Sequence, residues 1–95
     1  MPVRWLTLAL DDLDHIVEFV ARDKPSAAKR IAEALWKAGQ RLVEHPAMGR
    51  PGRVTGTREW VIPGTPYIMA YRVRDDVIEI LRVLHSAMDW PSEFG

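Results

Sequence analysis

The sequence predicts an α+β fold with the element order β-α-α-β-β-β, in which an N-terminal helical hairpin packs on a mostly antiparallel sheet. Two observations lead to this prediction. Residues 7–44 repeat apolar side chains at helical spacing. Residues 58–85 then hold three runs rich in β-formers, separated by two short turns, and this pattern is typical of an antiparallel meander. Helices and strands that are segregated along a chain favour helices on one face of a sheet.

The chain is 95 residues long and has neither net charge nor cysteine. This length predicts one domain, residues 1–95. A neutral chain is not a general binder of polyanions, and a chain without cysteine forms neither a disulfide framework nor a thiolate zinc site. No apolar run approaches the roughly 20 residues of a membrane helix, and the N-terminus does not read as a signal peptide. We therefore expect a cytoplasmic protein with no membrane contact.

The N-terminal half predicts a short strand and two helices. The strand is expected at Val3–Leu6, and Thr7 is suited to cap the helix that follows. Pro25 suits the first turn of a second helix running to Glu44, in which Gly39 indicates a close contact. The short link between the helices favours an antiparallel hairpin. The apolar stripes are Leu10, Leu13, Ile16, Val17 and Val20 in the first helix, and Ala28, Ile31, Leu35, Ala38 and Leu42 in the second.

The C-terminal half predicts a loop, the meander and a tail. Residues 46–57 are rich in proline, glycine and arginine, so we expect a loop. Residues 63–66 join the first two strands, since their prolines do not fit a central strand. Residues 77–84 are almost continuously apolar, which favours a central strand covered on both faces. The tail is expected over residues 86–95.

The polar residues indicate few enzyme chemistries. The three histidines, His15, His45 and His85, fall in different predicted elements, and none has the spacing of a zinc ligand, so no metal site is expected. The serines lie outside any nucleophile elbow, and the glycines form no phosphate-binding loop. No cofactor is expected.

Metal-independent cleavage of RNA is an open alternative, because it needs only cationic and proton-shuttling side chains around a phosphate. Arg72, Arg82 and His85 are the candidates for this catalysis. Arg82 and His85 are three residues apart, so a flat strand would point them to opposite faces. The competing interpretation is that Arg72 and Arg82 pair with Glu79 or Asp75 on a solvated face of the sheet.

Short motifs run in order along nearly the whole chain. They are Ala9, Asp12-Leu13 and Ile16; Pro25 and Ala27-Ala28; Leu42, His45-Pro46 and Gly49-Arg50-Pro51-Gly52; Gly56-Thr57-Arg58-Glu59; Pro66-Tyr67-Ile68 and Tyr71-Arg72-Val73; and Ile80-Leu81-Arg82-Val83-Leu84-His85 with Trp90-Pro91. In this order and spacing the chain resembles the RelE/ParE superfamily of bacterial type II toxins, and the ParE branch in particular. The resemblance implies the RelE/ParE-like toxin fold.

The resemblance also implies a partner. Toxins of this kind are neutralised by an antitoxin encoded beside them, here a ParD-like protein, in a hetero-oligomeric complex. The C-terminal segment of such an antitoxin wraps the toxin, so we expect it on the helical hairpin and the sheet. The candidate antitoxin contacts are Leu13, Val17, Val20, Ile31, Leu35, Arg50 and Arg53.

The two branches of the superfamily differ in their target. ParE-like toxins bind DNA gyrase, whereas RelE-like toxins cleave messenger RNA on the ribosome. RelE-like nucleases commonly carry an arginine where this chain has Ile68, a basic residue or histidine where it has Ser86, and a tyrosine in the tail, which is absent here. The resemblance therefore favours a gyrase-binding toxin, with a RelE-like messenger RNA endoribonuclease or an inactive homologue as alternatives. The candidate target contacts are Arg58, Arg72, Arg82, His85 and Trp90.

Overall fold

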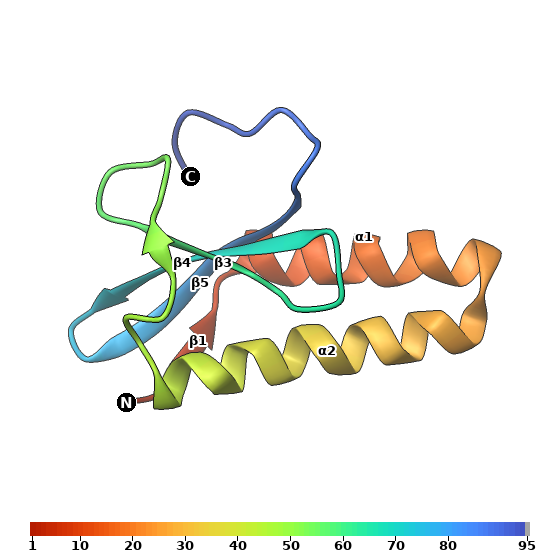
Figure 1. The fold of residues 1–95 in the computed structure, drawn as a ribbon, viewed down its shortest axis with the longest axis horizontal. Helices are drawn as coiled ribbons and strands as arrows, with labels where there is room; N and C mark the ends of the chain where they lie inside the picture. The colour runs from red at the N-terminus through yellow and green to blue at the C-terminus, as the bar shows by residue number, and fades with distance from the viewer. Residues whose placement is uncertain (95) are drawn as a thin grey trace.

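The computed structural model describes residues 1–94, which form two helices and one five-stranded sheet (Figure 1). Along the chain the elements are β1 (Val3–Trp5), α1 (Thr7–Asp23), α2 (Pro25–Glu44), β2 (Arg50–Pro51), β3 (Arg58–Val61), β4 (Tyr67–Arg74) and β5 (Val77–His85). The strand order is β1-β5-β4-β3-β2, with β1 parallel to β5 and the other pairs antiparallel. The predicted α+β fold is confirmed. The short strand β2 lies within the stretch expected to be a loop.

Helix α1 differs from its prediction in two places. Thr7 is the first helical residue rather than the cap, and the capping position falls on Leu6, which makes no side-chain cap hydrogen bond. Leu10, expected in the core, is 45% exposed, whereas Ala9 is fully buried. The stripe that faces the core therefore runs through Ala9, Leu13, Ile16 and Val20, which still follows helical spacing.

Helix α2 has the predicted bounds, and its buried residues include all of the predicted stripe except Ile31, which is half-buried. Gly39 lies at a close contact, as expected. A Cβ atom there would lie 3.1 Å from Cδ1 of Ile80 and 3.2 Å from Cζ2 of Trp5. The missing side chain thus lets α2 approach β5 and β1 closely. Trp5 also stacks on Trp36, with ring centroids 6.0 Å apart.

The meander has a tight turn and a bulge. Arg74 pairs with Val77 across a two-residue turn, whose Asp75 and Asp76 both have positive φ, the geometry of hairpin turns that match the twist of the strands. The β4–β5 register shifts between Ala70, which pairs with Arg82, and Tyr71, which pairs with Ile80. Leu81 is therefore an extra residue in β5.

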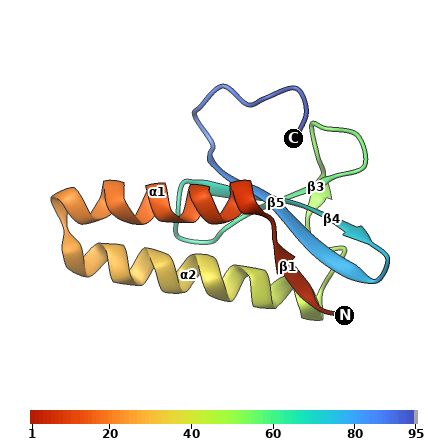
Figure 2. The same ribbon diagram turned by 180° about the vertical axis from the view of Figure 1, so that it is seen from behind.

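The two faces of the sheet are covered differently. The helix-facing side holds the main core, to which β4 and β5 contribute Tyr67, Met69, Tyr71, Ile78, Ile80 and Val83. The alternating residues of the same strands form what we call the second face: Ile68, Ala70, Leu81 and Leu84, all buried. Figures 1 and 2 show α2 on one side of the sheet and residues 86–94, the tail, on the other. The prediction that β5 is an interior strand with both faces covered is confirmed.

Candidate protein-binding surfaces

The segment between α2 and β3 is held by the hydroxyl of Tyr71. This hydroxyl accepts a hydrogen bond from the backbone N–H of Gly49 (2.9 Å) and donates one to the carbonyl oxygen of Pro46 (2.8 Å). Nη1 of Arg58 donates to the carbonyl oxygen of Gly49 at 2.7 Å. Burial raises the pKa of Tyr71, against the lowering effects of the Gly49 N–H and of Arg58. Arg58, a candidate target contact, therefore helps to anchor this segment.

Glu59 on β3 gathers the arginines of the same segment. This residue is only 3% exposed. Its carboxylate accepts the backbone N–H of Arg53 at 2.7 Å, and its Oε1 lies 3.3 Å from Nη2 of Arg50 and 3.5 Å from Nε of Arg53. A buried carboxylate needs such partners, because an unpaired charge in the interior is costly. Both arginine side chains remain about half exposed, at 58% and 46%, so they can still contact a partner.

Arg72 and Arg82 each have an acidic partner within the chain. Nε of Arg72 donates to Glu79 at 2.7 Å, which confirms one of the ion pairs expected from the sequence, and this hydrogen bond lowers the pKa of Glu79. Arg82 binds Asp12 on α1 through two hydrogen bonds of 2.7 and 2.9 Å, and Asp12 raises the pKa of Arg82. The expected partners of Arg82, Glu79 and Asp75, were wrong, because Asp12 comes from an element distant in sequence.

His85 and Trp90 lie together at the start of the tail. His85 is exposed, and its Nδ1 accepts the backbone N–H of Ala87 at 3.0 Å. Nε1 of Trp90 donates to the carbonyl oxygen of His85 at 3.3 Å. The other side of the tail meets the arginine segment, since the guanidinium carbon of Arg53 lies 3.9 Å from the centroid of the Trp90 ring.

The structure does not gather all five candidate target contacts at one point. His85 pairs with Tyr67 and so lies on the helix-facing side, whereas Arg82 pairs with Ala70 on the second face. The expected opposite orientation of Arg82 and His85 is thus confirmed. Trp90 is close to His85, but the three arginines are anchored elsewhere by Gly49, Glu79 and Asp12.

A groove runs along α2, between this helix and the β3–β4 turn. One hollow of about 380 Å³ extends from Val20 and Ile31 to Pro66 and Tyr67. It shares Ala34 and Pro63 with a neighbouring hollow of about 270 Å³, and Val20 and Ala27 with one of about 470 Å³ at the α1–α2 turn. We call the three together the α2 groove. Its charged lining is Arg22, Asp23, Lys24, Arg30, Lys37 and Arg41, so it is mainly basic.

The candidate antitoxin contacts fall into different environments. Val20 and Ile31 line the α2 groove. Leu13 and Val17 are half-buried on α1. Leu35 is fully buried in the core, so it cannot contact a partner in this conformation, and its place among the candidates was wrong. These candidates differ in burial because a helix between two layers buries the central residues of its apolar stripe completely and leaves the flanking residues partly exposed.

Sequence reasoning missed the basic lining of the α2 groove. Arg30, Lys37 and Arg41 follow one another at seven and four residues, which places them on one side of a helix. That spacing was the available signal. It became informative only when the β3–β4 turn was seen to form the opposite wall of the groove.

Two further features of residues 1–94 bear on function. No group of three or more histidine, aspartate or glutamate side chains in this described part of the chain could hold a metal ion. In the same range, neither helix is long and apolar enough to cross a membrane.

Comparison with known proteins gives consistent relatives. A family model for the ParE toxin of the type II toxin-antitoxin system parDE matches residues 3–90. Y4kP of Sinorhizobium fredii, a toxin by name, is 45% identical over 89 residues, which cover 94% of this chain and 92% of that protein. Toxin RelE2 of Caulobacter vibrioides is 36% identical over 85 residues, which cover 90% of this chain and 94% of that protein.

Solved structures share the fold. The chain is similar to one in the chromosomal ParDE toxin–antitoxin system from P. aeruginosa, with a TM-score of 0.83 and 27% identity, over 90% of this chain and 95% of that one. It is also similar to a chain of the toxin–antitoxin complex RelBE2 from Mycobacterium tuberculosis, with a TM-score of 0.62 and 29% identity, over 88% of this chain and 95% of that one.

Proposed function

The chain belongs to the ParE family of type II toxin–antitoxin toxins, and from this premise we propose that it inhibits DNA gyrase by binding and is neutralised by a cognate antitoxin. The proposal places the protein in the cytoplasm, where gyrase acts. The family membership carries the proposal, since it covers residues 3–90 and so includes both helices and all five strands.

The state of the candidate catalytic groups supports binding rather than RNA cleavage. Arg72 and Arg82 are engaged by Glu79 and Asp12, so their charge is already balanced within the chain. His85 lies on the opposite side of the sheet from Arg82. A general acid or base must be within hydrogen-bonding reach of the reacting group, together with the groups that stabilise its charge. This arrangement does not form such a set.

The α2 groove is the proposed docking site of the antitoxin. It combines apolar residues such as Val20, Ile31 and Tyr67 with the basic lining described above. A helix or extended segment with an apolar side and acidic flanks would match both features, because complementary charge steers and orients association. The two solved relatives come from the ParDE and RelBE2 toxin–antitoxin systems, which supports an adjacently encoded, ParD-like partner and a hetero-oligomeric complex.

A supercoiling assay tests the gyrase target. Purified toxin should inhibit supercoiling of relaxed plasmid by gyrase, and an excess of the antitoxin should restore it. Primer extension on messages after toxin induction runs in parallel. The absence of gyrase inhibition over a wide range of toxin concentrations, together with ribosome-phased cuts in the messages, would replace the proposal with the endoribonuclease alternative.

A substitution at His85 separates the same two functions. His85→Gln removes the imidazole and keeps a polar side chain of similar length; Ser86 N–H to the Pro66 carbonyl and Trp90 Nε1 to the His85 carbonyl still hold the start of the tail. Under the binding proposal the variant should inhibit growth nearly as well as the wild-type chain. General acid–base catalysis contributes about 10²- to 10⁴-fold, so a nuclease would lose most of its activity. A folded His85→Gln protein without toxicity would count against the binding proposal.

A further inference from the structure

The second face is buried although both helices pack mainly on the other side of the sheet and only the first part of α1 reaches it. Ile68 is 3% exposed, Ala70 0%, Leu81 6% and Leu84 3%. Both helices contribute instead to the core on the other side of the sheet. The tail lies over the second face, beside the 52–57 loop (Figures 1 and 2). A short irregular segment therefore covers an apolar surface in the middle of the sheet.

The first contact of the tail is an aromatic ring under an arginine. The guanidinium carbon of Arg53 lies 3.9 Å from the centroid of the Trp90 ring, which is a cation–π contact. Arg53 is itself oriented by Glu59, whose carboxylate accepts its backbone N–H and lies 3.5 Å from its Nε. This aromatic site is thus preorganised by a buried residue of β3.

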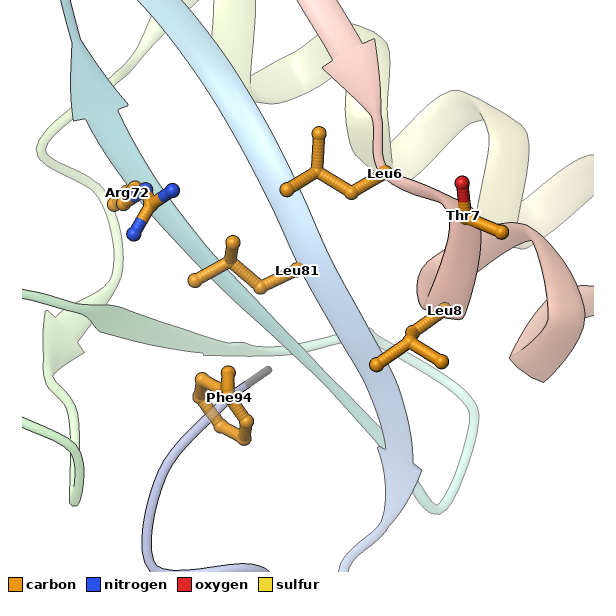
Figure 3. Close-up of a pocket in the computed structure, with 6 residues that line it drawn as sticks. All are labelled: Leu6, Thr7, Leu8, Arg72, Leu81 and Phe94. Atoms are coloured by element: carbon orange, nitrogen blue, oxygen red, sulfur yellow. The ribbon is translucent and has the colours of Figure 1, made fainter.

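The second contact is the ring of Phe94, which lies at the border of two hollows. One, of about 240 Å³, is lined by Leu6, Thr7, Leu8, Arg72, Leu81 and Phe94. Figure 3 shows these side chains coming from β4, β5, the start of α1 and the tail, with the Phe94 ring beside the hollow. The other, of about 340 Å³, again contains Arg72, Leu81 and Phe94, and adds Arg74 and Glu93.

The tail sequence repeats one chemical unit. An acidic residue precedes an aromatic residue in Asp89-Trp90 and again in Glu93-Phe94, four positions later. Each aromatic ring meets a place that also holds arginine: Arg53 for Trp90, and Arg72 for Phe94. The surface under the tail therefore offers two sites where an aromatic ring lies beside an arginine, separated by apolar residues of the second face.

We propose that the second face is a binding site for an extended partner segment carrying two acid–aromatic pairs, and that the tail occupies this site as an internal competitor. The residues of the tail therefore indicate which kind of segment the site binds. This proposal is independent of whether gyrase is the target, and it concerns the side of the sheet opposite the α2 groove. A partner reaches the site by displacing the tail.

The tail is suited to displacement. Its backbone hydrogen bonds to neighbouring segments are Ser86 N–H to the Pro66 carbonyl at 2.9 Å and Met88 N–H to the His85 carbonyl at 3.2 Å, both near its start. Beyond Met88 the described tail is held by side-chain contacts, so opening breaks no ladder of strand hydrogen bonds. Its covalent attachment nevertheless gives it an effective concentration on the order of millimolar. An external segment must overcome this competition.

A peptide-binding experiment tests the proposal. The probe is a fluorescein-labelled synthetic peptide with the sequence of residues 86–94, and binding is followed by fluorescence anisotropy. The proteins are the full chain and its Trp90→Ala/Phe94→Ala variant, in which the internal competitor is weakened and the site is unchanged. The peptide should bind the variant at least about tenfold more tightly than the wild-type chain. The affinity of a site for an external ligand falls in proportion to the fraction of molecules in which the site is open, and the tail keeps that fraction low in the wild-type chain.

Two controls make the result specific. Adding Arg53→Gln to the variant should weaken peptide binding, since the guanidinium over the indole is lost. A peptide in which each acid is moved away from its aromatic residue should bind more weakly than the probe. Circular dichroism and urea denaturation establish that each protein is folded, and Phe94→Ala alone replaces the double variant should the latter aggregate.

Three results would overturn the proposal. The first is equal affinity of the probe for the wild-type chain and the variant, since the tail would then not compete. The second is no binding of the probe by a folded variant at millimolar concentration. The third is equal affinity for the probe and the rearranged peptide, because the surface would then bind apolar segments without recognising the acid–aromatic pairs.

Discussion

Tyr71 is the residue on which the segment before β3 depends. It is completely buried, and its hydroxyl joins the N–H of Gly49 to the carbonyl of Pro46. A Cβ atom on Gly49 would lie 2.8 Å from this hydroxyl and 2.9 Å from the carbonyl oxygen of Glu59. The glycine therefore permits the close approach that the tyrosine stabilises.

Removing this hydroxyl should destabilise the fold. Tyr71→Phe leaves a buried N–H and a carbonyl without their partner, and such a loss costs about 1–3 kcal/mol. Tyr67→Phe is the matched control, because Tyr67 lies on the same strand and the same side of the sheet. Urea denaturation of both variants measures the difference. A Tyr71→Phe protein no less stable than Tyr67→Phe would show that the bridge contributes little.

Glu79 gives the fold a dependence on acid. The hydrogen bond from Arg72 lowers its pKa, so the pair stabilises the folded state above the ordinary glutamate pKa. This contribution is lost as the pH falls below the ordinary glutamate pKa and through the lowered pKa of the folded state. Glu79→Gln should therefore be less stable near neutral pH and lose less stability on acidification than the wild-type chain.

Urea midpoints at a series of pH values measure this effect. Glu33→Gln is the control, since it removes the same charge from an exposed residue of α2 that forms none of the ion pairs described above. Its plot of urea midpoint against pH should follow that of the wild-type chain. Parallel curves for Glu79→Gln and the wild-type chain would mean that the pair does not link pH to stability.

At the scale of elements, α1 is tied to β5 by Asp12. Its carboxylate accepts two hydrogen bonds from Arg82 and, through Oδ2, the backbone N–H of Val83 at 2.9 Å. The N–H of Val83 belongs to the part of β5 that extends beyond its pairing with β1, which ends at Ile80. The helix thus completes the hydrogen bonding that the short strand β1 leaves open.

Losing Asp12 should loosen this attachment. Asp12→Ala removes charge-assisted hydrogen bonds and leaves Arg82 without its acid, at a cost of about 1.5–3 kcal/mol. Asp11→Ala, an exposed neighbour on the same helix, is the control and should cost much less. Chemical denaturation gives both values, and hydrogen exchange at the Val83 N–H should accelerate in the first variant alone. Unchanged exchange there would argue against the attachment.

For the whole molecule, the α2 groove and the second face are separate surfaces on opposite sides of the sheet. A change in the groove should therefore affect the antitoxin without affecting growth inhibition. Ala34→Glu places a negative charge between two of the hollows. Like charges that face each other across an interface cost several kcal/mol, so affinity for an acidic antitoxin segment should fall by at least about tenfold.

Co-purification and calorimetry with the adjacently encoded antitoxin measure this loss. Gln40→Glu adds the same charge at an exposed position of α2 outside the groove and should leave binding intact. Growth inhibition by Ala34→Glu should persist and should resist rescue by the antitoxin. Equal loss of affinity in both variants would point to a general charge effect, and the groove assignment would fail.

Much of the fold could be predicted because it depends on local signals. The bounds of α2 follow from Pro25 and from the proline after His45, and the close approach at Gly39 follows from its place in mid-helix. Contacts between distant segments could not be predicted. The Arg82–Asp12 pair joins residues 70 positions apart, and no local pattern indicates it. Leu10 was wrong as a core residue because it lies at the edge of the apolar stripe of α1, and Ala9 takes the core position in the first part of the helix.

The candidate surfaces were predicted less completely, for a related reason. Val20 and Ile31 were identified because apolar residues at helical spacing form a stripe that packs against another surface. The basic lining and the sites of Trp90 and Phe94 depend on which loops and turns lie opposite, and that is a property of the assembled sheet. A single sequence indicates which residue types form a surface, but it does not show which residues lie opposite them.

The pairing of β1 with β5 has a consequence for how the toxin is made. β1 holds residues 3–5, and its partners are residues 78–80, so β1 cannot pair before β5 has been synthesised. The attachment of α1 through Asp12 waits for residues 82 and 83 as well. During synthesis the helical hairpin can form early, but the completed sheet cannot. A nascent chain stalled before β5 would therefore present exposed apolar helices to chaperones and proteases, and a message truncated before the codons of β5 would yield no folded toxin.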